Sequence, residues 1–368
     1  MRIAFDHQVF GLHEYSGISR YLHEIASHLA FRTEHKIAVV SPLYVNKYLR
    51  SAPAKLRIHG MPVPRLRKTS RIYQAANNFL APTLLKNFRP DIVHETDYST
   101  RRYAPLGARI VLTVYDMIHE RLPESFSPGD MTWSNKKAAV ERADHVICIS
   151  EHTRRDLVEL LDVPWEKTSV VHLGFSLTES ANSKTEASCV TKPFLLYVGT
   201  RLPYKNFDGL VSAYAASTFL RSGFDIVCFG GGAFSRSEQE HIQQAGIPAG
   251  SIRQVSGSDA VLAALYRSAH AFVYPSHYEG FGIPPLEAMA FDCPVACSGT
   301  SSIPEVVGDA ALIFDPGDIE AMRSALERIA GDDALRETLI RRGRDRVKHF
   351  AWSRCADETL EVYKKVTA

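Results

Sequence analysis

Short, continuous runs of apolar residues alternate with helix-like segments through the first half of the chain. The runs predict strands at Arg2–Phe5, Ile37–Val40, Ile92–His94, Ile110–Val114 and His145–Ile149. Continuous apolar runs of this length are typical of parallel strands that are buried on both faces. Between them, apolar residues recur at helical spacing and predict helices at Ile18–Ala30, Trp133–Ala143 and Glu151–Leu161.

The alternation starts again after a polar segment. Residues 176–192 are rich in Ser, Thr and Ala, lack helical periodicity and predict a linker between domains. Beyond it, strands are predicted at Phe194–Val198, Phe224–Phe229, Ala271–Tyr274, Pro294–Cys297 and Ala311–Phe314. Helices are predicted at Asn206–Ala216, Asp259–Ser268, Pro285–Phe291 and Ile319–Ala330. Two such series predict two doubly wound α/β domains, and ligands of such sheets lie beyond the carboxyl ends of the strands. The cleft between the domains is therefore the expected site.

Length and composition agree with two globular domains. The chain has 368 residues, of which 45% are hydrophobic and 23% are charged, which excludes a disordered chain. No apolar run approaches the roughly 18 residues that a membrane-spanning helix needs. Six scattered cysteines form no CxxC pair, which favours buried, reduced thiols in a cytoplasmic protein over disulfides or a zinc site.

A net charge of only +2 conceals one strongly basic stretch. Residues 35–90 contain no Asp or Glu but eleven Lys and Arg, so the remainder of the chain sums to −9. This distribution excludes a uniformly basic nucleic-acid binder, and no nucleic-acid recognition motif accompanies it. Two interpretations of the 36–89 stretch stay open. It is either a surface that docks on an anionic membrane or attracts a lipid-diphosphate acceptor, or a solvated basic face.

The segment from Tyr274 to Ala290 carries the most informative chemistry. After a predicted strand, Gly280, Phe281, Gly282 and Ile283 form a turn at a helix start, where peptide N–H groups bind an anion such as a diphosphate. Glu279 and Glu287 bracket this turn. Because carboxylates suit hydroxyl groups, the pattern indicates a sugar or ribose beside the anion.

The E-x7-E spacing within EGFGIPPLEAMA resembles the signature of retaining glycosyltransferases of family 4, also called glycosyl transferases group 1. Tyr15–Tyr21 resembles the first glycine loop of that family, and Val198–Asn206 its strand followed by a basic segment. These landmarks span nearly the whole chain. The resemblance implies the α/β GT-B fold, in which two Rossmann-like doubly wound domains face a central cleft.

The resemblance also implies roles for individual residues. Glu287 is expected to hold the ribose hydroxyls, and Glu279 those of the transferred sugar, as a catalytic residue. Arg201 and Lys205 are expected to clamp the diphosphate, where fixed cations stabilise the departing charge. Gly17 is expected to let the backbone approach the donor or the acceptor.

One position departs from the family pattern. Many members have a histidine after the strand that corresponds to Val111–Val114, and here Tyr115 stands there. A tyrosine hydroxyl still hydrogen-bonds a sugar, but it is not a cation near neutral pH. Asp116 and His119 lie in the same loop, and which of the three contacts the donor sugar stays open.

Together these features predict a retaining hexosyltransferase with acceptor domain 1–175, nucleotide-sugar domain 192–350 and a C-terminal helix, 351–368, that packs back on the first domain. The expected substrates are a nucleotide sugar, with GDP-mannose as first candidate ahead of UDP or dTDP sugars, and a growing, lipid-linked glycan of a cell-surface polysaccharide such as lipopolysaccharide. No metal or other cofactor is expected, since the chain has no Asp-x-Asp motif. The expected location is the cytoplasm, peripheral on the inner face of the cell membrane. Two alternatives stay open: another GT-B enzyme such as a sugar-nucleotide epimerase, and a non-catalytic nucleotide-sugar-binding partner of a polysaccharide assembly complex.

Overall fold

The computed structural model describes residues 1–66, 69–176 and 192–368. The chain divides into two compact units. Unit 1 comprises Met1–Arg121, Phe126–Gly174 and Ala351–Ala368, and unit 2 comprises Leu122–Ser125 and Phe175–Phe350. The predicted linker lies almost wholly in 177–191, outside the described residues, as do Arg67, Lys68 and Cys189.

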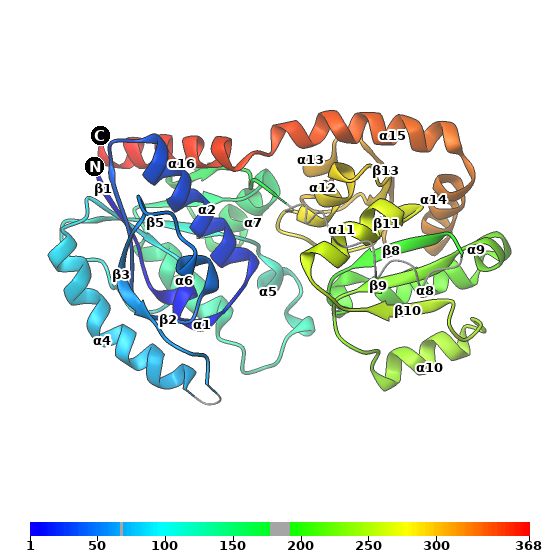
Figure 1. Cartoon of the computed structure of the whole chain (residues 1–368), viewed down its shortest axis with the longest axis horizontal. Helices are drawn as coiled ribbons and strands as arrows, with labels where there is room; N and C mark the ends of the chain where they lie inside the picture. The colour runs from blue at the N-terminus through cyan, green and yellow to red at the C-terminus, as the bar shows by residue number, and fades with distance from the viewer. Residues whose placement is uncertain (67–68, 177–191) are drawn as a thin grey trace. The chain divides into compact units, whose positions relative to one another are not determined.

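The described part of unit 1 contains a seven-stranded sheet in the order β3-β2-β1-β4-β5-β6-β7, with every neighbouring pair parallel (Figure 1). The strands are β1 (Arg2–Phe5), β2 (Lys36–Tyr44), β3 (Arg57–Pro62), β4 (Ile92–Glu95), β5 (Arg109–Val114), β6 (His145–Cys148) and β7 (Thr168–Val170). The helices are α1 (Gln8–Leu12), α2 (Gly17–Arg32), α3 (Lys47–Arg50), α4 (Ser70–Phe88), α5 (Ile118–Arg121), α6 (Thr132–Arg142), α7 (Glu151–Leu161) and α16 (Trp352–Thr367).

The described part of unit 2 repeats this architecture with a six-stranded parallel sheet in the order β10-β9-β8-β11-β12-β13. The strands are β8 (Phe194–Val198), β9 (Asp225–Phe229), β10 (Ile252–Val255), β11 (Ala271–Tyr274), β12 (Val295–Ser298) and β13 (Ala311–Phe314). The helices are α8 (Phe207–Ala215), α9 (Thr218–Gly223), α10 (Arg236–Gln244), α11 (Asp259–Ser268), α12 (Ile283–Ala290), α13 (Ile303–Val307), α14 (Ile319–Gly331) and α15 (Asp333–Arg346). The two sheets confirm the predicted pair of doubly wound α/β domains.

Every strand predicted from an apolar run is present, but three strands carry no such run. β3, β7 and β10 all lie at an edge of their sheet. In β3, buried and exposed residues do not alternate regularly, and most of the strand is exposed. The sequence of β10 is Ile-Arg-Gln-Val, and only its first residue is buried. An edge strand is covered less completely than a central one, so the continuous apolar signal of a strand buried on both faces is missing there.

The chain returns to unit 1 at its end, where α16 packs against α2 (Figure 1). Gly174 lies so close to this helix that an added Cβ would come within 2.7 Å of atoms of Trp352. Inside the core, His94 Nδ1 lies 2.5 Å from the Tyr363 hydroxyl, and His94 Nε2 lies 2.9 Å from Thr113 Oγ1. Burial lowers the pKa of His94 to about 3, so this histidine is a neutral link between the sheet and α16.

The remaining compositional predictions concern cysteines and membrane spans. Cys148, Cys228, Cys293, Cys297 and Cys355 are all buried and free. Burial raises the pKa of Cys228 and of Cys355 to about 12, which keeps both thiols protonated. Among the residues that the structure describes, no helix combines the length and the apolar character needed to cross a bilayer.

Candidate functional site

Two of the predicted donor residues of unit 2, Lys205 and Glu279, form a largely buried ion pair. Lys205 Nζ donates to Glu279 Oε1 at 2.6 Å, and the two side chains are 16% and 9% exposed. Lys205 follows β8 and Glu279 follows β11, two neighbouring parallel strands whose carboxyl ends meet at one edge of the sheet. The ring centroid of Tyr274 lies 5.6 Å from Lys205 Nζ. Burial and then the charge of Glu279 raise the pKa of Tyr274, so its hydroxyl stays neutral beside the pair.

The glycine turn after Glu279 leads into α12 as predicted. Gly282 has a φ of 108°, a left-handed conformation that glycine adopts without a steric penalty, and it caps α12 without a side-chain hydrogen bond. Ser302 anchors the turn, because its hydroxyl donates to the carbonyls of Glu279 and Phe281. Pro284 and Pro285 stand in the first turn of α12, where a helix needs no N–H donor of its own, and the N-terminal end of the helix carries the positive end of its dipole.

Glu287 lies one helical turn into α12 and is partly exposed. The Tyr266 hydroxyl donates to Glu287 Oε2 at 3.2 Å. Burial and then the Glu287 charge raise the pKa of Tyr266, so this tyrosine remains a donor that orients the carboxylate. Such an orientation suits a carboxylate that accepts hydrogen bonds from two adjacent hydroxyls.

Arg201 is engaged elsewhere in unit 2. Its Nε lies 2.5 Å from Glu238 Oε1, and its Nη atoms donate to the carbonyls of Gly230, Gly231, Gly232 and Ala233. Its side chain is only 4% exposed. In this structure Arg201 therefore holds the glycine loop after β9, and Lys205 alone of the two predicted cations contacts Glu279.

Glu238 was not predicted, although its signal is legible in the sequence. It is the fourth residue of Ser-Arg-Ser-Glu, and with Ser235 it forms a capping box at the start of α10. Burial raises the pKa of Glu238, but the Ser235 N–H and the Arg201 guanidinium lower it by more, so the net shift is downward. Glu238 is therefore a charged anchor for Arg201.

A cavity of about 820 Å³ opens beside this arginine. It is lined by Arg201, Glu238 and residues of α8 and α10, and by neither Lys205, Glu279 nor Glu287. The volume is large enough for a ligand of drug size, but the carboxylates that suit sugar hydroxyls lie outside it. The site is therefore better defined by the Lys205–Glu279 pair and the glycine turn than by cavity size.

The remaining predicted residues belong to unit 1. Gly17 is the first residue of α2, after Ser16, which forms a capping box with Ser19. An added Cβ at Gly17 would meet no atom within 4 Å, so packing alone does not require glycine there. Tyr115 follows β5, and its N–H donates to the Tyr98 hydroxyl.

The side chain of Tyr115 is buried among aromatic rings. Its ring centroid lies 5.8 Å from that of Tyr21 and 6.3 Å from that of Tyr98, and its hydroxyl is buried without a partner among the described residues. Burial, and then Tyr21 and Tyr98, raise its pKa. Of the three candidates in this loop, Asp116 and His119 are the accessible ones, with side chains 30% and 22% exposed.

A buried lysine that was not predicted holds this loop from beneath. Lys136 Nζ, on α6, donates to the Asp116 carbonyl and to Glu120 Oε2, each at 2.8 Å, and lies 3.7 Å from Asp116 Oδ1. The Lys136 and Glu120 side chains are 1% and 2% exposed. No sequence pattern distinguishes Lys136 from the exposed lysine that follows it.

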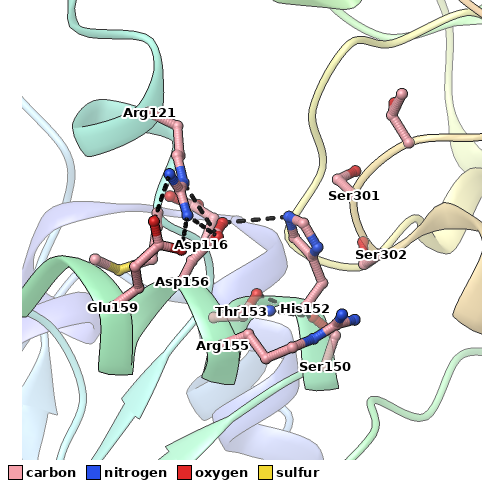
Figure 2. A network of polar contacts seen from close by, with 12 residues as sticks. Asp116, Arg121, Ser150, His152, Thr153, Arg155, Asp156, Glu159, Ser301 and Ser302 are labelled. Carbon is pink, nitrogen blue, oxygen red and sulfur yellow. Dashed lines mark hydrogen bonds and ion pairs between the residues drawn. The ribbon is translucent and has the colours of Figure 1, made fainter.

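The far end of the loop is fixed to α7 (Figure 2). Arg121 Nη2 lies 2.6 Å from Asp156 Oδ1 and 2.5 Å from Glu159 Oε2, and His152 Nε2 lies 3.2 Å from Asp156 Oδ2. Hydrogen bonds to Asp156 and then to Glu159 raise the pKa of Arg121. The loop that carries Asp116 and His119 is therefore anchored by ion pairs of two cations, Lys136 on α6 and Arg121 at the end of the loop.

No group of three or more His, Cys, Asp or Glu side chains suited to a metal ion occurs within the described ranges 1–66, 69–176 and 192–368.

Comparison with known proteins assigns these two units to a family. The model of the family described as "Glycosyltransferase Family 4" matches residues 15–179, and that of "Glycosyl transferases group 1" matches residues 179–346. The fold and these matches define a glycosyltransferase with the α/β GT-B architecture. The chain belongs to glycosyltransferase family 4: it is 30% identical to the O-antigen chain mannosyltransferase B of Escherichia coli, over 95% of this chain and 96% of that protein.

More distant similarities agree. The chain is 28% identical to the serotype-specific mannosyltransferase WbdA of Escherichia coli, over 64% of this chain and 30% of the longer WbdA. Among solved structures, a sucrose-phosphate synthase from Thermosynechococcus elongatus superposes with a TM-score of 0.75 at 20% identity, covering 99% of this chain and 98% of the other. That structural likeness shows the shared fold.

The buried pair beneath the Asp116 loop yields a first prediction. Lys136→Met leaves the Glu120 carboxylate buried without its ammonium partner, and we expect it to lower the free energy of unfolding of unit 1 by about 3–5 kcal/mol. All three tryptophans, Trp133, Trp165 and Trp352, belong to unit 1, so urea denaturation followed by tryptophan fluorescence reports this unit.

A second substitution separates lost charge pairing from lost packing. Lys136→Met with Glu120→Leu removes both charges and is expected to recover most of the loss. Arg354→Met, which breaks an exposed pair with Glu358 in the same unit, serves as the control and should change stability by less than about 1 kcal/mol. A Lys136→Met variant as stable as the parent would contradict the role assigned to the pair.

Proposed function

We propose that this chain is a retaining, metal-independent hexosyltransferase that extends a lipid-linked glycan during synthesis of a cell-surface polysaccharide. The single observation that supports this most is its full-length similarity to an O-antigen chain mannosyltransferase. Mannose from GDP-mannose is the first candidate donor, and a UDP or dTDP sugar is the second. Unit 2 supplies the donor residues and unit 1 the acceptor residues.

The chemistry of unit 2 supports donor binding without a metal. The Lys205 ammonium and the N-terminal end of α12 offer positive charge to a diphosphate. Glu279 and Glu287 offer acceptors to sugar and ribose hydroxyls. Because Lys205 already faces a carboxylate, a bound diphosphate would share this cation with Glu279, and the pair would orient both groups.

Retention of configuration in a single displacement requires attack and departure on the same face of the sugar. In the proposed reaction, the bond between the anomeric carbon and the diphosphate oxygen breaks while an acceptor oxygen bonds to that carbon. The proton of the acceptor hydroxyl passes to the departing phosphate. The protein's part is to stabilise the charge that develops on the diphosphate, which is the role assigned to Lys205.

The two rival functions differ in what they need. An epimerase would convert the donor sugar with no acceptor present, and a non-catalytic partner would bind the nucleotide sugar without turnover. The similarity to a mannosyltransferase over 95% of this chain favours an enzyme over a binding module.

The donor site yields a second prediction. Glu279→Ala and Lys205→Ala are each expected to lower the rate of sugar transfer by about 100- to 1000-fold, the range measured when one stabilising group is removed from a transition state. Transfer from GDP-, UDP- and dTDP-sugars to a lipid-linked glycan is measured by mass spectrometry of the product. Lys205→Ala should also weaken binding of the matching free nucleoside diphosphate in calorimetry.

Glu240→Ala is the matched control, because Glu240 pairs with an exposed arginine in the same unit. Its transfer rate should equal that of the parent. Folded variants of Glu279 and Lys205 with undiminished transfer would refute this assignment, and conversion of the donor without any acceptor would favour the epimerase.

We also propose that unit 1 docks on an anionic membrane through its basic stretch. Eight cations of this stretch are exposed and unpaired with any described carboxylate: Lys36, Arg50, Lys55, Arg57, Arg65, Arg71, Lys86 and Arg89. The helix α4 adds apolar groups among them, with Ile72 66%, Phe79 80% and Leu80 42% exposed. Exposed apolar side chains among cations suit the interface of a bilayer with anionic lipids.

The membrane proposal yields a third prediction. Reversing three cations in Arg65→Glu, Arg71→Glu and Lys86→Glu removes at least roughly 3 kcal/mol of attraction, so binding to vesicles with anionic lipid should weaken about 100-fold or more. Reversal of Arg236, Arg341 and Lys348 in unit 2 is the control and should have little effect. Equal binding of the parent protein to neutral and anionic vesicles, measured by co-sedimentation, would refute the proposal.

A further inference from the structure

A second, smaller cavity lies in unit 1, where β1 and β4 end beside α4. Its volume is about 130 Å³, well below the roughly 300 Å³ of the smallest pockets for drug-sized ligands. Polar side chains dominate its lining: His7, Gln8, Gln74, Asn77, Asn78, Asp97, Ser99, Tyr103 and Asn135. A small cavity with this many hydrogen-bonding groups suits a compact ligand rich in hydroxyls.

His7 is the group that points to a ligand. Its side chain is only 2% exposed, and its ring stacks edge-on against Tyr103 with centroids 4.7 Å apart. Nε2 lies 3.1 Å from Asn78 Oδ1, which also accepts a hydrogen bond from the Tyr103 hydroxyl at 2.9 Å. Because that oxygen only accepts, Nε2 is the donor of this contact, and Nδ1 is the acceptor whenever the imidazole carries one proton. Nδ1 is then a bare acceptor, and it is buried without a partner among the described residues.

An unsatisfied buried acceptor destabilises the folded protein relative to a satisfied one. The protein nonetheless holds His7 in one orientation through Asn78 and Tyr103. An O–H group that reached Nδ1 would satisfy it while leaving the contact of Nε2 with Asn78 in place.

Asp97 supplies a second acceptor. One carboxylate oxygen, Oδ1, accepts the Tyr98 N–H at 2.8 Å. Burial raises the pKa of Asp97, and the Tyr98 N–H opposes this rise. Gln8 Nε2 donates to Asp6 Oδ2, which leaves the Gln8 carbonyl oxygen as a further acceptor at the cavity.

Asn77 shows how this lining differs from ordinary packing. Its amide donates to the Leu43 carbonyl and accepts the Leu43 N–H, so it ties α4 to β2. Asn78, the next residue, is turned toward His7 and Tyr103 instead. Adjacent asparagines on one helix thus serve two purposes, one of which is the cavity.

We propose that this cavity binds one sugar residue of the glycan acceptor, with His7 Nδ1 accepting a hydrogen bond from a sugar hydroxyl and Asp97 accepting another. The inference rests on the proposed function, since it assigns the acceptor's sugar to a place in unit 1. His7 and Asp97 are binding residues here and take no part in bond breaking.

The test uses the full-length protein without any donor. Nitrogen-15 spectra of histidine side chains are recorded while the methyl α-glycosides of mannose, galactose and N-acetylglucosamine are added in turn. The His7 signal is assigned by its loss in His7→Phe, which keeps a ring against Tyr103. We expect at least one glycoside to shift the unprotonated Nδ1 signal of His7 saturably, as a new hydrogen bond to that nitrogen requires.

Variants place the bound sugar in the cavity. Gln74→Ala removes an exposed lining amide, so the fold should be unaffected, and it should weaken glycoside binding by about tenfold. Gln243→Ala, an exposed glutamine on α10, should leave binding unchanged. In transfer assays, His7→Phe and Gln74→Ala should raise the acceptor KM without changing the KM for the nucleotide sugar.

Absence of any His7 shift with all three glycosides would overturn the inference, as would an unchanged acceptor KM in both variants. Because the spectra need no turnover, failure here is separable from failure of the proposed function. A protein that transfers sugar but shows no shift lacks this subsite, whereas one that shows the shift but transfers nothing has the subsite without the proposed activity.

Discussion

Parallel strand pairing is the constraint on which the arrangement of this protein depends. Since each described sheet contains only parallel pairs, the carboxyl ends of its strands lie along one edge. In unit 1, three polar residues lie at this edge: His7, Asp97 and Asp116 follow the ends of β1, β4 and β5. In unit 2, Lys205 and Glu279 lie at the corresponding edge, after the ends of β8 and β11. The functional side chains belong to loops, but the backbone hydrogen bonds between strands decide which loops are neighbours.

Buried charge pairs then fix the loops that leave this edge. Lys136–Glu120 is nearly inaccessible to water, and Lys205–Glu279 is largely buried. Such pairs add little net stability over apolar packing, but removing one partner is strongly destabilising. Each loop is thereby limited to conformations that keep its pair intact. Arg121 extends the same device by tying the end of the Asp116 loop to α7 (Figure 2).

The features legible in the sequence are those with a local signal. Central strands are continuous apolar runs, and the turn before α12 carries its glycines and prolines, so the two domains and the Glu279 region are predictable. Lys136 and Arg201 are different. Whether a lysine lies on the buried face of α6, and which carboxylate an arginine meets, depends on residues distant in the chain. Glu238 is intermediate, because its capping box is local but its partner is not.

The helix α4 turns successive residues toward different surroundings. Successive residues of a helix are turned by about 100°, so neighbours point in different directions. Asn77 ties α4 to β2, Asn78 faces the cavity with His7, and Phe79 is 80% exposed among cations. The exposed face with Phe79 is therefore distinct from the face that carries Asn77 and Asn78, both of which line the cavity. A charge introduced at Phe79 should disturb docking while leaving the Asn77 and Asn78 hydrogen bonds intact, because no atom of the exposed face contributes to them.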